Sequence, residues 1–148
     1  MIEVRTAPAD CPEAGKLMRE LSETLLSVTG RSGESSFSIS NMAHPRALFA
    51  IAYLDGTPAG CGAIREYAPD TAELKRMYAR VKGRGVGKAL LKYLENEAAR
   101  LNYKKIILET GPVNAGAVRF YLSNGYEVCE NFGHYAGQAD SVCFSKAL

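Results

Sequence analysis

The sequence has little of what marks a membrane protein or a nucleic-acid-binding protein. Its 18 basic and 16 acidic residues leave a formal net charge of +2, so there is no bulk electrostatic reason to expect binding to nucleic acid or to a membrane surface. Its longest apolar run, residues 47–54, is far too short to cross a bilayer. The first ten residues lack the basic-then-apolar order of a signal peptide. We therefore expect a cytoplasmic protein.

Metal-binding and disulfide patterns are also missing. The four cysteines are scattered without a C-x-x-C pair, and only two histidines accompany them. In a chain of this length without an export signal, reduced core thiols are expected rather than zinc ligands or disulfide partners, and we expect no metal. With 148 residues, 47% of them hydrophobic, the chain is long enough for one domain, residues 1–148, with a sizeable core.

What the sequence does contain is a regular succession of apolar patterns separated by turn residues. Alternation and short apolar runs predict seven strands, at residues 1–7, 47–54, 58–67, 71–79, 104–110, 126–132 and 141–147. Spacings of three and four predict helices at about 10–30, 88–101 and 114–125, with a short helix near 38–43. Asp55-Gly56 is typical of a tight hairpin. This order of elements indicates an α/β fold.

The first two long helices carry more detailed expectations. Asp10 is a candidate cap for the first helix, with Pro12 in its first turn. The apolar stripe of this helix would be Ala14, Leu17, Leu21, Leu25 and Val28. On the helix at 88–101, the buried face would be Leu91, Leu94, Ala98 and Leu101, and the polar face Lys92, Glu95, Asn96 and Arg100. We expect the polar stretch 31–41, which follows the first helix, to form a mobile loop beside a functional site.

Three glycines and three basic residues lie between the strand predicted at 71–79 and the first turn of the helix predicted at 88–101. Gly83, Gly85 and Gly87 would let the backbone approach a phosphate, and Lys82, Arg84 and Lys88 add positive charge. Unpaired N–H groups and the helix dipole make such a turn an anion site, although a glycine-rich turn with solvated basic residues is an equally open alternative. A Walker loop is excluded because Ala89 follows Gly87-Lys88, and a dinucleotide fingerprint because it needs glycine at position 88.

From Glu73 to Val128 the chain resembles the Gcn5-related N-acetyltransferase (GNAT) superfamily. The hallmark of that superfamily is Gln/Arg-x-x-Gly-x-Gly/Ala between a strand and a long helix. Residues 82–87 match it with lysine in the first position and lead directly into the helix, whereas residues 80–85 offer a second register. We prefer the first register. The resemblance implies a mixed, mostly antiparallel, V-splayed sheet of about seven strands flanked by about four helices.

The resemblance also implies acetyl-CoA as cosubstrate and assigns residues to it. The pyrophosphate would lie against Lys82, Gly83, Arg84, Gly85, Val86, Gly87 and Lys88. The pantetheine arm would pair with the backbone of Met77, Tyr78 and Ala79 like an added strand. Asn114 and Tyr121 match family positions that contact the cofactor from the following helix.

Acetyl transfer to an amine needs a neutral nucleophile, a stabilised oxyanion and a protonated leaving thiolate. Because free lysine-like amines have a pKa of ~10.4, a base must remove a proton on or before attack. Glu73 matches a glutamate that similar proteins use, often through water, and Glu109 is its rival. Tyr121 matches the tyrosine that protonates the thiolate, and an amide of the strand, such as that of Met77, would bind the oxyanion. Each residue also has a purely structural alternative: Glu73 could be a solvated residue of the sheet, and Tyr121 could be an aromatic residue of the core.

The acceptor amine is the least defined part of the prediction. Residues 31–41 carry only Arg31 and Glu34 as charges, so no acidic run would recruit a basic protein tail. This favours a small amine attacked directly in a ternary complex, by a monomer or homodimer. A protein lysine or N-terminal acetyltransferase, a non-catalytic CoA-binding regulator and a structural interaction domain are the alternatives. His134 could face the acceptor, but a surface-loop histidine is the expected role.

Overall fold

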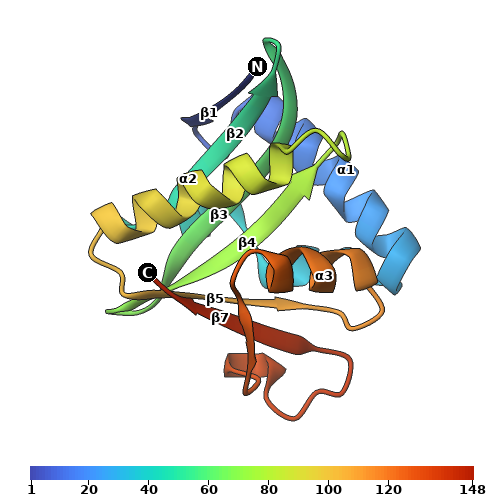
Figure 1. Ribbon diagram of the computed structural model, residues 1–148, viewed down its shortest axis with the longest axis vertical. Coiled ribbons are helices and arrows are strands. Elements are labelled where there is room, and N and C mark those ends of the chain that lie inside the picture. Colours follow the sequence, from blue (N-terminus) through green and yellow to red (C-terminus); the bar gives the residue numbers. More distant parts are fainter.

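A computed structural model describes residues 1–148 and shows a seven-stranded sheet with helices on both faces (Figure 1). The strands are β1 (Ile2–Thr6), β2 (Leu48–Leu54), β3 (Thr57–Ala68), β4 (Thr71–Ala79), β5 (Lys105–Thr110), β6 (Glu127–Cys129) and β7 (Val142–Ala147). The α-helices are α1 (Pro12–Thr29), α2 (Val86–Arg100) and α3 (Ala115–Ser123). Three 3-10 helices complete the chain: η1 (Glu34–Ser36), η2 (Ile39–Ala43) and η3 (Gly133–Tyr135). The short helix expected near residues 38–43 is η2.

The strands lie in the order β1-β2-β3-β4-β5-β7-β6, and every neighbouring pair is antiparallel except β4 and β5. The hairpin between β2 and β3 turns at Asp55 and Gly56, which both have positive φ, as a two-residue turn of this kind requires. Helix α2 connects β4 to β5 and packs across the sheet, which makes the two strands parallel. The mixed, mostly antiparallel sheet predicted from the sequence is confirmed.

The sheet opens between its two central strands. β4 and β5 pair only from Thr71 to Glu73 and from Lys105 to Ile107, although both strands continue further. Figure 1 shows the two strands diverging beyond this short pairing. Arg76 has a φ of 55° and lies in a bulge of β4, where the register against β3 shifts. A bulge bends and twists its strand, so it helps to turn the end of β4 away from β5.

Two hydrophobic cores cover the two faces of the sheet. The larger one joins α2 and α3 to residues such as Ala50, Ile64 and Leu108, and the smaller one joins α1 to Phe49, Ile51 and Ala63. Because successive strand residues point to opposite faces, β2 supplies both cores and is buried almost throughout. None of the helices combines the length and the apolar composition needed to cross a membrane.

Three expectations about the helices are wrong. Cys11, not Asp10, precedes α1, because a residue before proline is held extended and Pro12 is the first helical residue. Val28 is 47% exposed, so it does not belong to the buried stripe. Glu95 lies among the buried residues of α2, because Tyr126 and Lys146 reach it from the far end of the chain.

Candidate functional site

The diverging strands leave a cleft, which we call the main cleft, of about 780 Å³. Its walls include Lys75 and Met77 of β4, Glu109 of β5, Asn114 and Tyr121 of α3, and residues of α1, η1 and the loop before β7. Gly62 on β3 makes room for Met77, since a Cβ at position 62 would lie 2.5 Å from its sulfur. The cleft forms because β4 and β5 pair over only a short segment. It lies at the carboxyl end of that segment, which is where ligands of α/β sheets bind.

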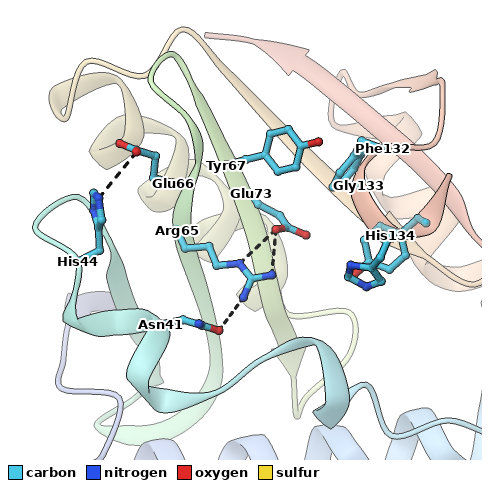
Figure 2. A pocket seen from close by; sticks show the side chains of 10 residues that line it. Asn41, His44, Arg65, Glu66, Tyr67, Glu73, Phe132, Gly133 and His134 are labelled. Atoms are coloured by element: carbon cyan, nitrogen blue, oxygen red, sulfur yellow. Dashed lines mark hydrogen bonds and ion pairs between the residues drawn. The ribbon is translucent and has the colours of Figure 1, made fainter.

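A second pocket of about 390 Å³, which we call the side pocket, adjoins the main cleft (Figure 2). Its ten lining residues are Asn41, His44, Arg65, Glu66, Tyr67, Glu73, Phe132, Gly133, His134 and Tyr135. The side pocket and the main cleft share His134 and Tyr135. His134, expected on a surface loop, therefore borders both cavities and stacks against the Tyr135 ring at 4.1 Å between ring centres.

Glu73, the predicted base, lines the side pocket but not the main cleft, and it is only 4% exposed. Its Oε1 accepts hydrogen bonds from Nε and Nη2 of Arg65, at 3.1 and 3.0 Å. Its Oε2 lies 3.7 Å from the ammonium of Lys75 and accepts no hydrogen bond at shorter range. One carboxylate oxygen is therefore fixed, while the other keeps its lone pairs for a proton or a water molecule.

Lys75 is a site residue that the sequence reasoning missed. Its side chain is 9% exposed, and its Nζ donates to Ser36 Oγ and to Tyr135 Oη, both at 3.0 Å. Burial lowers the pKa of Lys75, and the charge of Glu73 opposes this shift only in part. Burial likewise raises the pKa of Tyr135 to about 12. The sequence did hold one indication of this role: Glu73 and Lys75 are two residues apart on a predicted strand, so both side chains point to the same face of the sheet.

Arg76 is the second residue that the sequence did not reveal. Its guanidinium is buried and donates to the carbonyl oxygens of Met18 and Ser32 and to Ser22 Oγ. These bonds connect the bulge of β4 to α1 and to the loop before η1. Arg76 therefore fixes the wall of the main cleft that the sequence predicted to be mobile.

Glu109, on β5, and Tyr121, on α3, both line the main cleft. Glu109 accepts a hydrogen bond of 2.7 Å from Ser141 and has no cationic side chain within 4 Å. Tyr121 packs its ring against Phe120, Tyr126 and Phe144, and burial alone raises its pKa. The ring thus packs in the core, as the structural alternative expected, while the hydroxyl makes no hydrogen bond within the protein and its predicted role toward the thiolate stays a prediction.

The glycine turn, which we define as residues 82–87, lies outside the main cleft and follows the end of β4. Gly83 and Gly85 have φ values of 73° and 80°, and no side chain caps the start of α2. The first amides of α2 are therefore without helical partners, as an anion site requires. Gly87 lies in the first turn of α2, where a Cβ would come within 3.3 Å of the Phe120 ring, and its place in the phosphate site stays a prediction.

The other residues assigned to the cofactor divide into two groups. Met77, Asn114 and Tyr121 line the main cleft together, and Asn114 also caps α3 by accepting from the amide of Ala117. The side chain of Tyr78 instead turns toward α1, where it donates to Glu20, and Val86 is buried in the larger core. Tyr78 and Val86 can therefore meet a ligand only through their backbones.

Comparison with known proteins identifies the family. The model of the acetyltransferase (GNAT) family matches residues 16–126 of the chain. The chain belongs to this family. An IAA acetyltransferase from Azospirillum brasilense is 31% identical over 139 residues, which cover 90% of this chain and 89% of that protein. As a family member the chain is an acyltransferase, and the resemblance stated from Glu73 to Val128 is confirmed.

Solved structures agree with the fold. A putative acyl-CoA N-acyltransferase from Klebsiella pneumoniae superposes with a TM-score of 0.83 at 24% identity, over 100% of this chain and 98% of that one. A GNAT family acetyltransferase from Elizabethkingia anophelis, solved with acetyl-CoA bound, superposes with a TM-score of 0.73 at 18% identity, over 99% and 98% of the two chains. The fold described above is thus one that binds acetyl-CoA in another family member.

Proposed function

We propose that residues 1–148 form a single N-acetyltransferase domain that transfers acetyl from acetyl-CoA to the primary amine of a small molecule. The observation that carries this proposal is the main cleft between the splayed strands, which Met77, Glu109, Asn114 and Tyr121 line together. Acceptor and thioester would meet there in a ternary complex, with direct attack of the amine. The four free thiols suit a reducing compartment, and we propose the cytoplasm.

The chain offers a complementary feature for each part of the cosubstrate. The edge of β4 from Leu74 to Ala79 has no partner strand on the β5 side, so its backbone groups are available to the pantetheine amides. The amides that begin α2, with Gly83 and Gly85 before them, would receive the pyrophosphate. The exposed side chains of Lys82, Arg84 and Lys88 would add screened positive charge. We find no cluster of metal ligands, and the proposal involves no metal.

In this proposal Glu73 accepts the proton of the acceptor amine, directly or through a water molecule. Its Oε2 lies 3.7 Å from Lys75, which lines the main cleft, while Arg65 holds Oε1 in place. Glu109 is the second candidate, because it lines the main cleft itself without a cationic partner. An amide near the bulge of β4, such as that of Met77, would donate to the developing oxyanion.

Tyr121 would assist the departing thiolate as a hydrogen-bond donor. Burial raises its pKa, so the phenol stays protonated at neutral pH, but complete proton transfer to a thiolate becomes less favourable. A hydroxyl that has no partner inside the protein is free to donate to the sulfur. The structure of the site thus favours stabilisation of the thiolate over full general-acid catalysis.

Isothermal titration with acetyl-CoA, followed by thiol release with a panel of amines, tests the proposal. We expect saturable binding and amine-dependent release of CoA, with weak dependence of the acceptor KM on salt. Binding without transfer to any amine would instead indicate a CoA-binding regulator. A preference for lysine-rich peptides, with a KM that rises steeply with salt, would indicate a protein acetyltransferase. Absence of binding would indicate an interaction domain.

A further inference from the structure

The side pocket contains a guanidinium with two unused donors. Arginine carries five N–H groups. Arg65 uses three of them: Nε and Nη2 donate to Glu73, and Nη1 donates to Asn41 Oδ1 at 2.6 Å. One N–H on each terminal nitrogen therefore remains, on a side chain that is only 19% exposed and lines the pocket. Figure 2 shows Arg65 fixed between Glu73 and Asn41.

Asn41 adds further donors beside this guanidinium. Its Oδ1 accepts from Arg65 and from the backbone amide of Ser38, which identifies the opposite side of the amide group as the NH₂. This Nδ2 makes no hydrogen bond within the protein, and Asn41 lines the side pocket. Of the carboxylate oxygens that line the pocket, Oε1 of Glu66 binds Arg46 and Oε1 of Glu73 binds Arg65, while Oε2 of Glu73 lies 3.7 Å from Lys75. Two N–H groups of Arg65 and the NH₂ of Asn41 thus make no hydrogen bond within the protein.

We propose that the side pocket recognises a carboxylate on the acceptor, so that the substrate is a small amine that also carries a carboxylate, such as an amino acid. This inference rests on the proposed function, because it assigns the acceptor of that same reaction. Arg65 and Asn41 would bind the two oxygens, in the paired geometry that a guanidinium offers to a carboxylate. Because Arg65 also holds Glu73, the amine of the same molecule would lie beside the free Oε2 of Glu73.

The remaining wall of the pocket is aromatic. Phe132 contacts Tyr67 and Tyr135 edge to face, with ring centres 5.2 and 5.4 Å away. These rings would contact apolar atoms of the acceptor. Because the Arg65 side chain is only 19% exposed, its charge would favour a bound carboxylate over uncharged analogues.

Matched acceptors and matched variants test the inference. Glycine, L-methionine and L-phenylalanine are each compared with the corresponding α-carboxamide, as acceptors in steady-state acetylation. For at least one pair, the parent protein should prefer the amino acid by about tenfold or more in kcat/KM. Asn41→Asp keeps the Oδ1 contacts but places a negative charge beside the bound carboxylate. It should abolish that preference mainly through the KM of the amino acid, and leave the KM of acetyl-CoA unchanged.

Arg65→Lys is the second variant, since it keeps a charge near Glu73 but loses the paired donors, and it should weaken the same preference. Asn96→Asp is the control, because it introduces the same charge on the exposed face of α2 and should change nothing. Equal acetylation of amino acids and amides, or an unchanged preference in Asn41→Asp, would overturn the inference while leaving the proposed function intact.

Calorimetric binding of the same pairs to protein saturated with CoA provides a readout that needs no turnover. Selective binding of an amino acid that Asn41→Asp abolishes supports the side pocket, even if no acetylation is detected. In that case the proposed function fails and the inference about recognition stands. Equal affinity for amino acid and amide overturns the inference.

Discussion

The glycine turn and the charged cluster differ in how their properties arise. The glycine turn, residues 82–87, is continuous in sequence, mostly exposed, and offers backbone amides at the start of α2. The charged cluster, which we define as Arg65, Glu73, Lys75 and Tyr135, joins β3, β4 and the loop before β7 and is largely buried. The proposed phosphate site thus depends on one short segment, whereas the proposed acid–base site requires distant residues to constrain one another.

The most severe way to disrupt the charged cluster is Glu73→Gln. We expect turnover at neutral pH to fall about a hundredfold or more, because the amide cannot accept the proton of the amine. Turnover should partly recover as the pH rises toward ~10.4, where a free amine loses its proton unaided. Steady-state rates over a range of pH measure this effect, and titration with acetyl-CoA should show unchanged affinity.

Glu109→Gln is the matched comparison for this prediction. It makes the same chemical change in a carboxylate that lines the main cleft but has no cationic partner. We expect a much smaller loss of turnover. If Glu109→Gln abolishes activity while Glu73→Gln keeps the parent rate and pH profile, the base is Glu109 and the role of the charged cluster is structural.

Gly85→Ala disrupts the other member of the comparison, the glycine turn. A Cβ at position 85 meets only Ile2, at 3.8 Å, but the left-handed backbone there is unfavourable for alanine by about 1–2 kcal/mol. The turn should therefore shift away from its phosphate-binding conformation, and the Kd for acetyl-CoA should rise about tenfold, as measured by calorimetry. Gly30→Ala is the control, because Gly30 has a φ of 81° and open space around it at the end of α1. Equal affinities in both variants would remove the glycine turn from the binding site.

Tyr121→Phe examines a residue of the main cleft that belongs to neither region. Since its hydroxyl makes no hydrogen bond within the protein, the variant should keep the stability of the parent and lose about tenfold in kcat. Tyr126→Phe makes the same change where the hydroxyl donates to buried Glu95, so it should lose about 1–3 kcal/mol of unfolding free energy without a comparable loss in kcat. Chemical denaturation and kinetics of both variants separate the two roles. A destabilised but fully active Tyr121→Phe would assign Tyr121 to packing alone.

The smallest expected effect concerns the ionisation of Tyr135 at the rim of the charged cluster. Burial raises its pKa to about 12, so its contribution to stability is present below about pH 10 and is lost as the pH rises from 10 to 12. The unfolding free energy of the parent should therefore fall faster in this range than that of Tyr135→Phe, by up to about 1.4 kcal/mol per pH unit. Urea denaturation at several pH values measures both slopes, and parallel curves would show that Tyr135 is not buried in solution.

The same contrast explains how far the sequence could predict the structure. Six of the strands and the Asp55-Gly56 hairpin depend on local patterns and agree with the prediction. The strand predicted at 126–132 is shorter, β6 (Glu127–Cys129), and α2 begins at Val86, two residues before the predicted start. Glu95 was assigned to the polar face of α2, because helical spacing cannot show that Tyr126 and Lys146 reach it. Arg65 gave no local signal either, since its role depends on Asn41 and Glu73 from other segments. Apart from Glu73, which the family resemblance indicated, the residues that converge on the charged cluster by tertiary packing are those that the sequence did not reveal.

A single-turnover experiment tests the proposed acetyl transfer most directly. Protein and acetyl-CoA are mixed rapidly with and without an amino acid, and mass spectrometry follows the acetyl group on the protein and on the amine. The account predicts one acetylated amine for each CoA released, and no acetylated protein when the amine is omitted. Acetylation of the protein itself at the rate of turnover, or tight binding of acetyl-CoA without transfer to any amine, would contradict it.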